Sequence, residues 1–299
     1  MSTTIRRIIL LCLGLLAGMA AWPLAELVVS AQARFGSYLA LQSALGAAVG
    51  LVMGAAFGSA EGLYARDRRR MALGAALGAA IGAVGGVLGS LAGQAFLLGV
   101  GARLMASFSS QRSFTRIVLP VSRAVAWAVL GLFVGAAEGV RAGSPRKAAV
   151  GVLGGILGGL VGGVLLEYSR LLLPLGATSR LIGLVVLGVA VAFFYGLIER
   201  GFAAGVLRVL NGRLKGKEFL VNQRRARIGS SPRSEIALPG YEDLAERHAE
   251  VRLRRGEVVI TSLEPRAPVL VNDRPVEERV LKYEDVVKVG QAKLFFRYE

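Results

Sequence analysis

Six long apolar stretches limit what this chain can fold into more than any other feature. A helix needs about 20 apolar residues to cross about 30 Å of hydrocarbon, and each stretch reaches that length. The sequence therefore predicts a bundle of membrane-spanning helices, with spans near residues 8–30, 38–64, 71–100, 117–140, 148–168 and 181–206.

The pattern changes near residue 206, where short runs of alternating apolar and polar residues begin. We predict strands near residues 206–210, 217–221, 226–228, 235–238, 249–253, 258–261, 268–271, 286–289 and 293–298. Turn signals such as Asn211-Gly212 and Asn272-Asp273 separate them, and many short strands of this spacing favour a β-sandwich. The expected fold class is α+β in separate domains: an all-α membrane region over residues 1–205, then an all-β sandwich over residues 206–299.

Composition excludes several classes of function. The single cysteine, Cys12, and the single histidine, His248, cannot form a zinc cluster, and there is no P-loop or serine-hydrolase motif. We therefore expect neither an enzyme nor a cofactor or metal site. The net charge of +16 lies mostly in the membrane half, where arginines flank the spans, so membrane topology explains it without a nucleic-acid partner.

The distribution of arginines predicts the topology. Arg6, Arg7 and the connections at residues 66–70 and 141–147 hold nine Lys and Arg, against six at Arg34, Arg103, Arg112, Arg116, Arg170 and Arg180 on the other side. The more basic side faces the cytoplasm, which puts both termini and the sandwich at the cytoplasmic face of an inner membrane. The first span resembles a cleavable leader, but its apolar run continues to Ser30, so we interpret it as a retained anchor.

The membrane half contains an internal repeat. A shift of 77 residues without a gap superimposes segment 46–90 on segment 123–167, and it aligns eight positions: seven Gly–Gly matches and the pair Glu61 and Glu138. A partial third copy follows at Gly188, Ala192, Gly196 and Glu199. We therefore expect a leading span, two helical hairpins of one design, and a half-repeat.

Glycines recur every fourth residue and form stripes along the predicted helices. Such stripes allow two backbones to approach closely, which is how helices associate in lipid. The stripes predict helix packing within one chain; a pore or the seam of a homo-oligomer is the functional alternative.

Four acidic residues stand at or near the ends of spans: Glu26, Glu61, Glu138 and Glu199. A carboxylate deep in the bilayer marks an ion or proton path, whereas one near the interface beside an arginine is solvated or paired. We favour the interfacial interpretation, and we extend it to Glu167.

The soluble half resembles a known family. Five blocks carry the resemblance: 226–229 (ARIG), 235–238 (EIAL), 246–251 (ERHAEV), 271–276 (VNDRPV) and 285–290 (DVVKVG). In order and spacing they are similar to a forkhead-associated (FHA) domain, and the membrane half looks like the region attached to some bacterial FHA proteins. The resemblance implies an eleven-stranded sandwich that binds phosphothreonine peptides through loops at one end, and a neighbourhood of Ser/Thr phosphorylation signalling.

The resemblance also implies a phosphate pocket, from which this sequence departs. The family arginine after Ile-Gly is Ser230 here, the serine three residues before the histidine is Ala245, and the loop at 263–268 lacks the asparagine. The candidate partner-binding residues are Ser230, Ser231, Arg233, Arg247, Arg266 and Asn272, and the structural motif residues are Gly229, His248 and Asn272.

The sequence thus predicts a non-enzymatic adaptor or scaffold in the membrane with a degenerate phosphothreonine pocket. Its partners are the lipid bilayer and a protein that carries phosphothreonine or lacks it. The alternative is an oligomeric channel or ion-coupled transporter that the FHA-like domain regulates.

Overall fold

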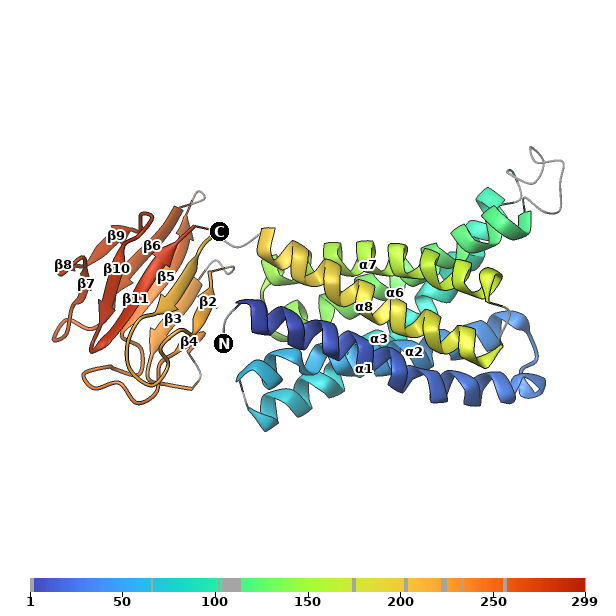
Figure 1. Cartoon of the computed structure of the whole chain (residues 1–299), viewed down its shortest axis with the longest axis horizontal. Helices are drawn as coiled ribbons and strands as arrows, with labels where there is room; N and C mark the ends of the chain where they lie inside the picture. The colour runs from blue at the N-terminus through green and yellow to red at the C-terminus, as the bar shows by residue number, and fades with distance from the viewer. Residues whose placement is uncertain are drawn as a thin grey trace. The chain divides into compact units, whose positions relative to one another are not determined.

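A computed structural model describes residues 3–65, 67–101, 103, 114–173, 176–201, 204–221, 225–232, 234–254 and 257–298. The chain divides into a helical unit, residues 7–199, and a second unit that contains residues 200–299 (Figure 1). Arg66, Arg112 and Arg233, all used above, lie outside the described residues.

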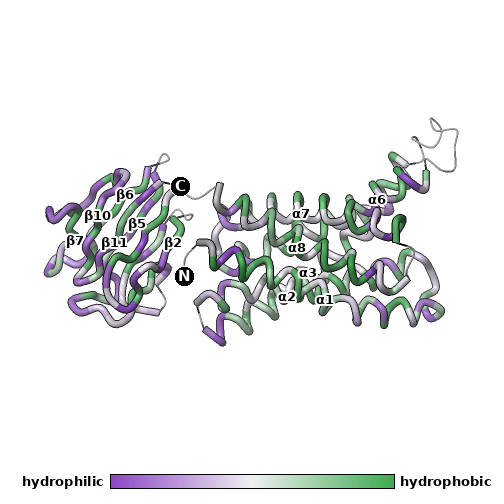
Figure 2. Tube along the Cα trace, in the orientation of Figure 1, coloured by the Kyte–Doolittle hydropathy of each residue, from purple (hydrophilic) through white to green (hydrophobic). Residues whose placement is uncertain are grey.

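Six long helices make up the first unit: α1 (Thr3–Ser30), α2 (Tyr38–Ala65), α3 (Arg68–Phe96), α6 (Leu119–Arg141), α7 (Pro145–Leu172) and α8 (Ala177–Gly201). Each is long and apolar enough to cross a membrane, and Figure 2 shows hydrophobic residues along their length. A 3-10 turn, η1 (Gln32–Arg34), follows α1. Two π-helical turns, η2 (Leu97–Gly101) and η3 (Phe114–Val118), extend α3 and precede α6.

The two predicted hairpins, α2–α3 and α6–α7, pack in the same way. A side chain on Gly58 would overlap the carbonyl of Gly74, and one on Gly135 would overlap the carbonyl of Gly151. These pairs differ by 77 residues in both partners. The repeat extends to the helix starts, where the side chains of Asp67 and Ser144 cap α3 and α7. In both hairpins the glycine stripes therefore lie against each other inside the chain.

The half-repeat in α8 finds its missing partner in α1, so the leading span is not a separate element. A side chain on Gly14 would overlap the carbonyl of Gly188, and one on Gly18 would overlap that of Leu184. The corresponding contacts in α2–α3 are Gly82 with Gly50 and Gly86 with Gly46. The first and last helices thus form a third hairpin, and buried residues of all three hairpins share one apolar core.

The second unit is a sandwich of two sheets. One has the strand order β2-β1-β11-β10-β7-β8 and the other β4-β3-β5-β6-β9. The strands are β1 (Val206–Val209), β2 (Glu218–Leu220), β3 (Arg225–Gly229), β4 (Ile236–Ala237), β5 (Ala249–Arg254), β6 (Glu257–Ser262), β7 (Val269–Val271), β8 (Arg274–Val276), β9 (Glu278–Val280), β10 (Val286–Val289) and β11 (Ala292–Arg297).

Alternate residues of these strands build the core between the sheets, where Ile228, Ile260, Leu294 and Phe296 are fully buried. The predicted fold class is confirmed. Two details of the prediction were wrong: α8 ends at Gly201 rather than near residue 206, and strands β8 and β9 were not foreseen.

Candidate functional site

The acidic residues of the membrane unit lie in two groups at opposite ends of the hairpins. We call the end with the α2–α3 and α6–α7 connections the turn end, and the other the cavity end. At the turn end, Arg141 donates hydrogen bonds to Glu61 and to Glu138, the latter at 2.9 Å. Lys147 lies 3.6 Å from the second oxygen of Glu61. Glu199 is buried near the end of α8.

At the cavity end, the α8–α1 hairpin contains a closed ion pair. Arg180 donates through Nε to Oε1 of Glu26 at 2.5 Å and through Nη2 to Oε2 at 2.7 Å. Trp22 also binds this end of α8, through its indole N–H and the carbonyl of Ala177 at 3.0 Å. Glu26 is therefore paired with an arginine near the end of α1.

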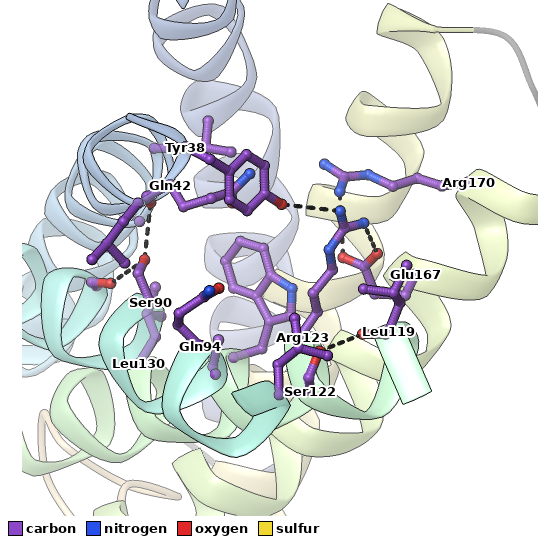
Figure 3. A pocket seen from close by; sticks show the side chains of 18 residues that line it. Tyr38, Gln42, Ser90, Gln94, Leu119, Ser122, Arg123, Leu130, Glu167 and Arg170 are labelled. Atoms are coloured by element: carbon purple, nitrogen blue, oxygen red, sulfur yellow. Dashed lines mark hydrogen bonds and ion pairs between the residues drawn. The ribbon is translucent and has the colours of Figure 1, made fainter. Parts of the chain in front are cut away.

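A cavity of about 280 Å³ lies at the same end, lined by residues of α2, α3, α6 and α7 (Figure 3). Glu167 is only 4% exposed there and accepts from Arg123 at 2.8 Å and from Arg170 at 3.3 Å. Arg123 also donates to the hydroxyl of Tyr38 at 3.3 Å. The analysis of the sequence missed this site, although an arginine inside an apolar span, Arg123, was a signal for it.

In the sandwich, three loops gather at one end. Cross-strand pairs place Ile228 opposite Ala249 and Ala249 opposite Ser262, so the end of β3, the start of β5 and the end of β6 lie together. The loops that leave these points are 230–235, 238–248 and 263–268. Among the candidates named above, Ser230, Ser231, Arg247 and Arg266 lie in them.

Backbone contacts brace this loop end. Gly229 lies so close to the carbonyl of Glu246 that a side chain would overlap it, and Ser230 N–H donates to the carbonyl of Ala245 at 3.0 Å. His248 is fully buried, and its Nδ1 accepts from Ala245 N–H at 3.2 Å. Its own N–H donates to the carbonyl of Ile228 at 2.9 Å. The imidazole of His248 therefore braces the 238–248 loop, and its backbone N–H ties that loop to β3.

The exposed face of this end carries charges of both signs, because Glu242, Asp243 and Glu246 are exposed there beside two arginines. Arg247 and Arg266 are both exposed, and neither guanidinium has an ion pair with any residue that the structure describes. Ser230 and Ala245 are half-buried below them in the loop frame. The frame residues Gly229 and His248 of the resemblance are present, while Ser230 and Ala245 stand at the positions where the resemblance implies an arginine and a serine donor.

Asn272 lies elsewhere. It follows the far end of β7, where its Nδ2 donates to Oδ1 of Asp285 at 2.7 Å and its Oδ1 accepts from Val286 N–H at 2.9 Å. Its φ of 52° and that of Asp273 at 61° form the tight β7–β8 turn. The structure therefore does not bring Asn272 together with the other candidate binding residues. The Asn272 side chain instead ties the β7–β8 turn to β10.

Similarity to known proteins covers the sandwich. Residues 208–299 match a family model described as the inner membrane component of T3SS, cytoplasmic domain. No curated protein matches the chain.

Solved FHA structures are similar to this domain. One, from a study of phosphothreonine-dependent FHA domain interactions, is 23% identical, covers 32% of this chain and 96% of its own, and has a TM-score of 0.30. The FHA domain of the CT664 protein from Chlamydia trachomatis is 23% identical, with coverages of 32% and 97% and a TM-score of 0.30. The cytoplasmic domain of the T3SS sorting platform protein PscD from P. aeruginosa is 18% identical, with coverages of 31% and 79% and a TM-score of 0.29.

The outer face of the five-stranded sheet in the FHA-type domain carries a charge cluster. Glu250 is fully buried under Arg225 and Arg252, which both donate to its Oε1, the second at 2.5 Å. Burial raises the pKa of Glu250, but these hydrogen bonds outweigh burial and hold the pKa below its usual value. The cluster ties β3 to β5 on this face of the sheet.

Proposed function

We propose that this protein is a non-enzymatic adaptor of the inner membrane whose FHA-type domain binds a protein partner at the cytoplasmic face. The loop end of the sandwich carries the proposal. It keeps the braced frame of Gly229 and His248, which holds three loops in place, and it presents the cations Arg247 and Arg266 to solvent. A rigid frame that exposes charges of both signs suits a charged protein segment, with Arg247 and Arg266 facing acidic residues of the partner.

The same loop end argues against tight phosphothreonine binding. A phosphate needs charge-assisted donors, each worth roughly 1.5–3 kcal/mol. Ser230 and Ala245 replace two such donors, and two losses at about 1.5 kcal/mol each amount to roughly a hundredfold in affinity. We therefore propose that the partner is recognised without phosphothreonine.

The orientation of the membrane unit supports a cytoplasmic position for the domain. Arg68, Arg141 and Lys147 lie at the turn end of the hairpins, and basic residues favour the cytoplasmic side. The family model that residues 208–299 match also describes a cytoplasmic domain of an inner-membrane component. By analogy with that description, we propose that the membrane unit anchors the domain and that the domain joins a cytoplasmic protein assembly.

The turn end favours an anchor over a transporter. Glu61 and Glu138 lie within the last two turns of α2 and α6, and both are bound by Arg141 at the helix end. Carboxylates paired there are compatible with an interfacial position and do not form a path across the bilayer.

The test is a capture experiment with the domain, residues 206–299, on lysates treated with phosphatase or left untreated. We expect the same partner in both lysates. A double Arg247→Ala, Arg266→Ala variant should lose that partner, while Arg254→Ala, which removes an exposed arginine away from the loops, should keep it. A partner that disappears after phosphatase treatment contradicts the proposal.

Calorimetry with a phosphothreonine peptide library tests the pocket directly. We expect the unmodified domain to bind weakly or not at all, and Ser230→Arg with Ala245→Ser to bind more tightly. Micromolar, phosphate-dependent binding by the unmodified domain would show that other arginines supply the missing charge.

A further inference from the structure

The cavity in the membrane unit owes its existence to a difference between the repeats. Arg123 and Glu167 face each other in the α6–α7 hairpin, and the positions 77 residues earlier hold Gly46 and Ser90. All four residues line the cavity. The α6–α7 hairpin has two large charged side chains at these positions, whereas the α2–α3 hairpin has a hydrogen atom and a hydroxymethyl group. The difference in side-chain volume leaves the cavity between the two hairpins.

A second difference leaves this cavity with unbalanced charge. In the α8–α1 hairpin, Arg180 and Glu26 pair one to one through two hydrogen bonds. In the cavity, one carboxylate, Glu167, serves two arginines, Arg123 and Arg170. The position of Arg170 is Gly93 in α3, so the second arginine is an addition to the repeat.

The polar residues that surround these charges are amides rather than further ions. Gln42 and Gln94 line the cavity, at the positions that Arg180 and Glu26 hold in the third hairpin. Each guanidinium has five N–H donors, and the described structure uses two from Arg123 and one from Arg170. The site is therefore rich in donors and positively charged, with leucines such as Leu39 and Leu130 on its walls.

We propose that this cavity binds a phosphate group carried by an amphiphile, with the phosphate on the N–H donors of Arg123 and Arg170 that Glu167 does not use and the apolar part against the leucines. Arginine suits this role because its planar fork matches phosphate oxygens in pairs. The volume of about 280 Å³ is several times the roughly 30 Å³ of a water molecule, so a phosphate with its glycerol fits. The same chemistry would accept a lipid head group from the bilayer or a free phosphate from solution.

The chain contains a reporter for the test. Its two tryptophans are Trp22 and Trp127, and only Trp127 lines the cavity. In the full chain with Trp22→Phe, purified in a neutral detergent, Trp127 is the only tryptophan. Its fluorescence is followed while short-chain phosphatidylglycerol, short-chain phosphatidylcholine or inorganic phosphate is added. We expect a saturable change with phosphatidylglycerol at concentrations at which phosphatidylcholine gives little.

Two variants separate specific binding from general charge. Arg170→Gln leaves Arg123 and Glu167 as a balanced pair, and we expect the affinity to fall about tenfold or more because one charge-assisted donor is lost. Arg116→Gln removes one exposed charge near the same end without touching the cavity lining, and its affinity should stay within about twofold. If Arg170→Gln does not fold, Gln42→Leu with Gln94→Leu replaces two cavity amides by the residues of the second hairpin, Leu119 and Leu171, and should also weaken binding.

The outcomes decide both the site and the source of its ligand. Saturation by the lipid without competition from inorganic phosphate assigns a bilayer lipid. Competition by inorganic phosphate at comparable concentration assigns a soluble phosphate. The proposal is overturned if the Trp127 fluorescence is unchanged by phosphatidylglycerol and by inorganic phosphate. An equal loss of affinity in Arg170→Gln and Arg116→Gln also overturns it.

Discussion

The three hairpins allow one substitution to be tested in three settings. Gly58, Gly135 and Gly196 are equivalent positions of the repeat. A side chain on Gly58 or Gly135 would overlap a backbone carbonyl of the partner helix, whereas Gly196 has nothing within 4 Å of its missing side chain. The same change to alanine should therefore have opposite effects.

The magnitudes follow from two opposing contributions. Alanine is favoured over glycine in a helix by about 0.8–1 kcal/mol, and this gain is common to all three sites. At Gly58 and Gly135 the methyl group must push two backbones apart, and such overpacking costs about 1–3 kcal/mol or more. Subtracting the gain from the cost, we expect Gly58→Ala and Gly135→Ala to lower the free energy of unfolding by up to about 2 kcal/mol, and Gly196→Ala to leave it unchanged or raise it by up to about 1 kcal/mol.

Unfolding of the full chain by SDS in mixed micelles, followed by circular dichroism, measures these differences. Each variant differs from the unmodified chain by one methyl group and is measured in the same detergent, so differences in unfolding between variants report the site of the substitution. Equal shifts at Gly58 and Gly196 would refute the close packing of α2 on α3 and with it the hairpin geometry.

Three further predictions concern topology, pH and the loop end. In a Cys12→Ser background, a membrane-impermeant thiol reagent added to intact cells should label Ser37→Cys and not Ala142→Cys; the reverse pattern contradicts a cytoplasmic turn end. The pKa of Glu250 lies below its usual value of 4.5, so its ion pairs stabilise the folded domain above that pH and are lost as the pH falls through the lowered value. The free energy of unfolding, measured with urea between pH 6 and 3, should therefore depend less on pH in Glu250→Gln than in the unmodified domain. His248→Ala leaves a cavity and removes the acceptor for Ala245 N–H, and should lower the stability of the domain by about 2–4 kcal/mol in the same assay; a change below about 0.5 kcal/mol would show that His248 does not brace the loops.

The strands that sequence patterns missed share a physical cause. β8 contains Pro275 and begins at Arg274, and β9 contains Glu278 and Arg279. Both are edge strands, β8 of the six-stranded sheet and β9 of the five-stranded one. Edge strands carry proline and charge because these residues prevent pairing with another chain, and the same residues hide the alternation that identifies a strand.

The cavity could not be predicted for a different reason. Its walls come from two hairpins, and its space comes from the small residues Gly46 and Ser90. Periodicity placed Gly46 on a glycine stripe, but it gave no information about which hairpin lies opposite. The pairing of α1 with α8 in the third hairpin could not be predicted for the same reason. These two helices are the first and the last of the membrane unit, so they are far apart in the sequence.

Departure from a shared template is where we look for function in both units. The sandwich keeps Gly229 and His248 of the motif that it resembles and differs at Ser230 and Ala245, so we expect the proposed recognition to depend on the positions that differ. The membrane repeat keeps its glycine contacts in each hairpin and differs at Arg170, which has no counterpart in α3. Packing explains the glycines that recur in the hairpins. An extra half-buried arginine is costly in a membrane, and in our proposal a ligand that compensates its charge is the physical reason to keep it.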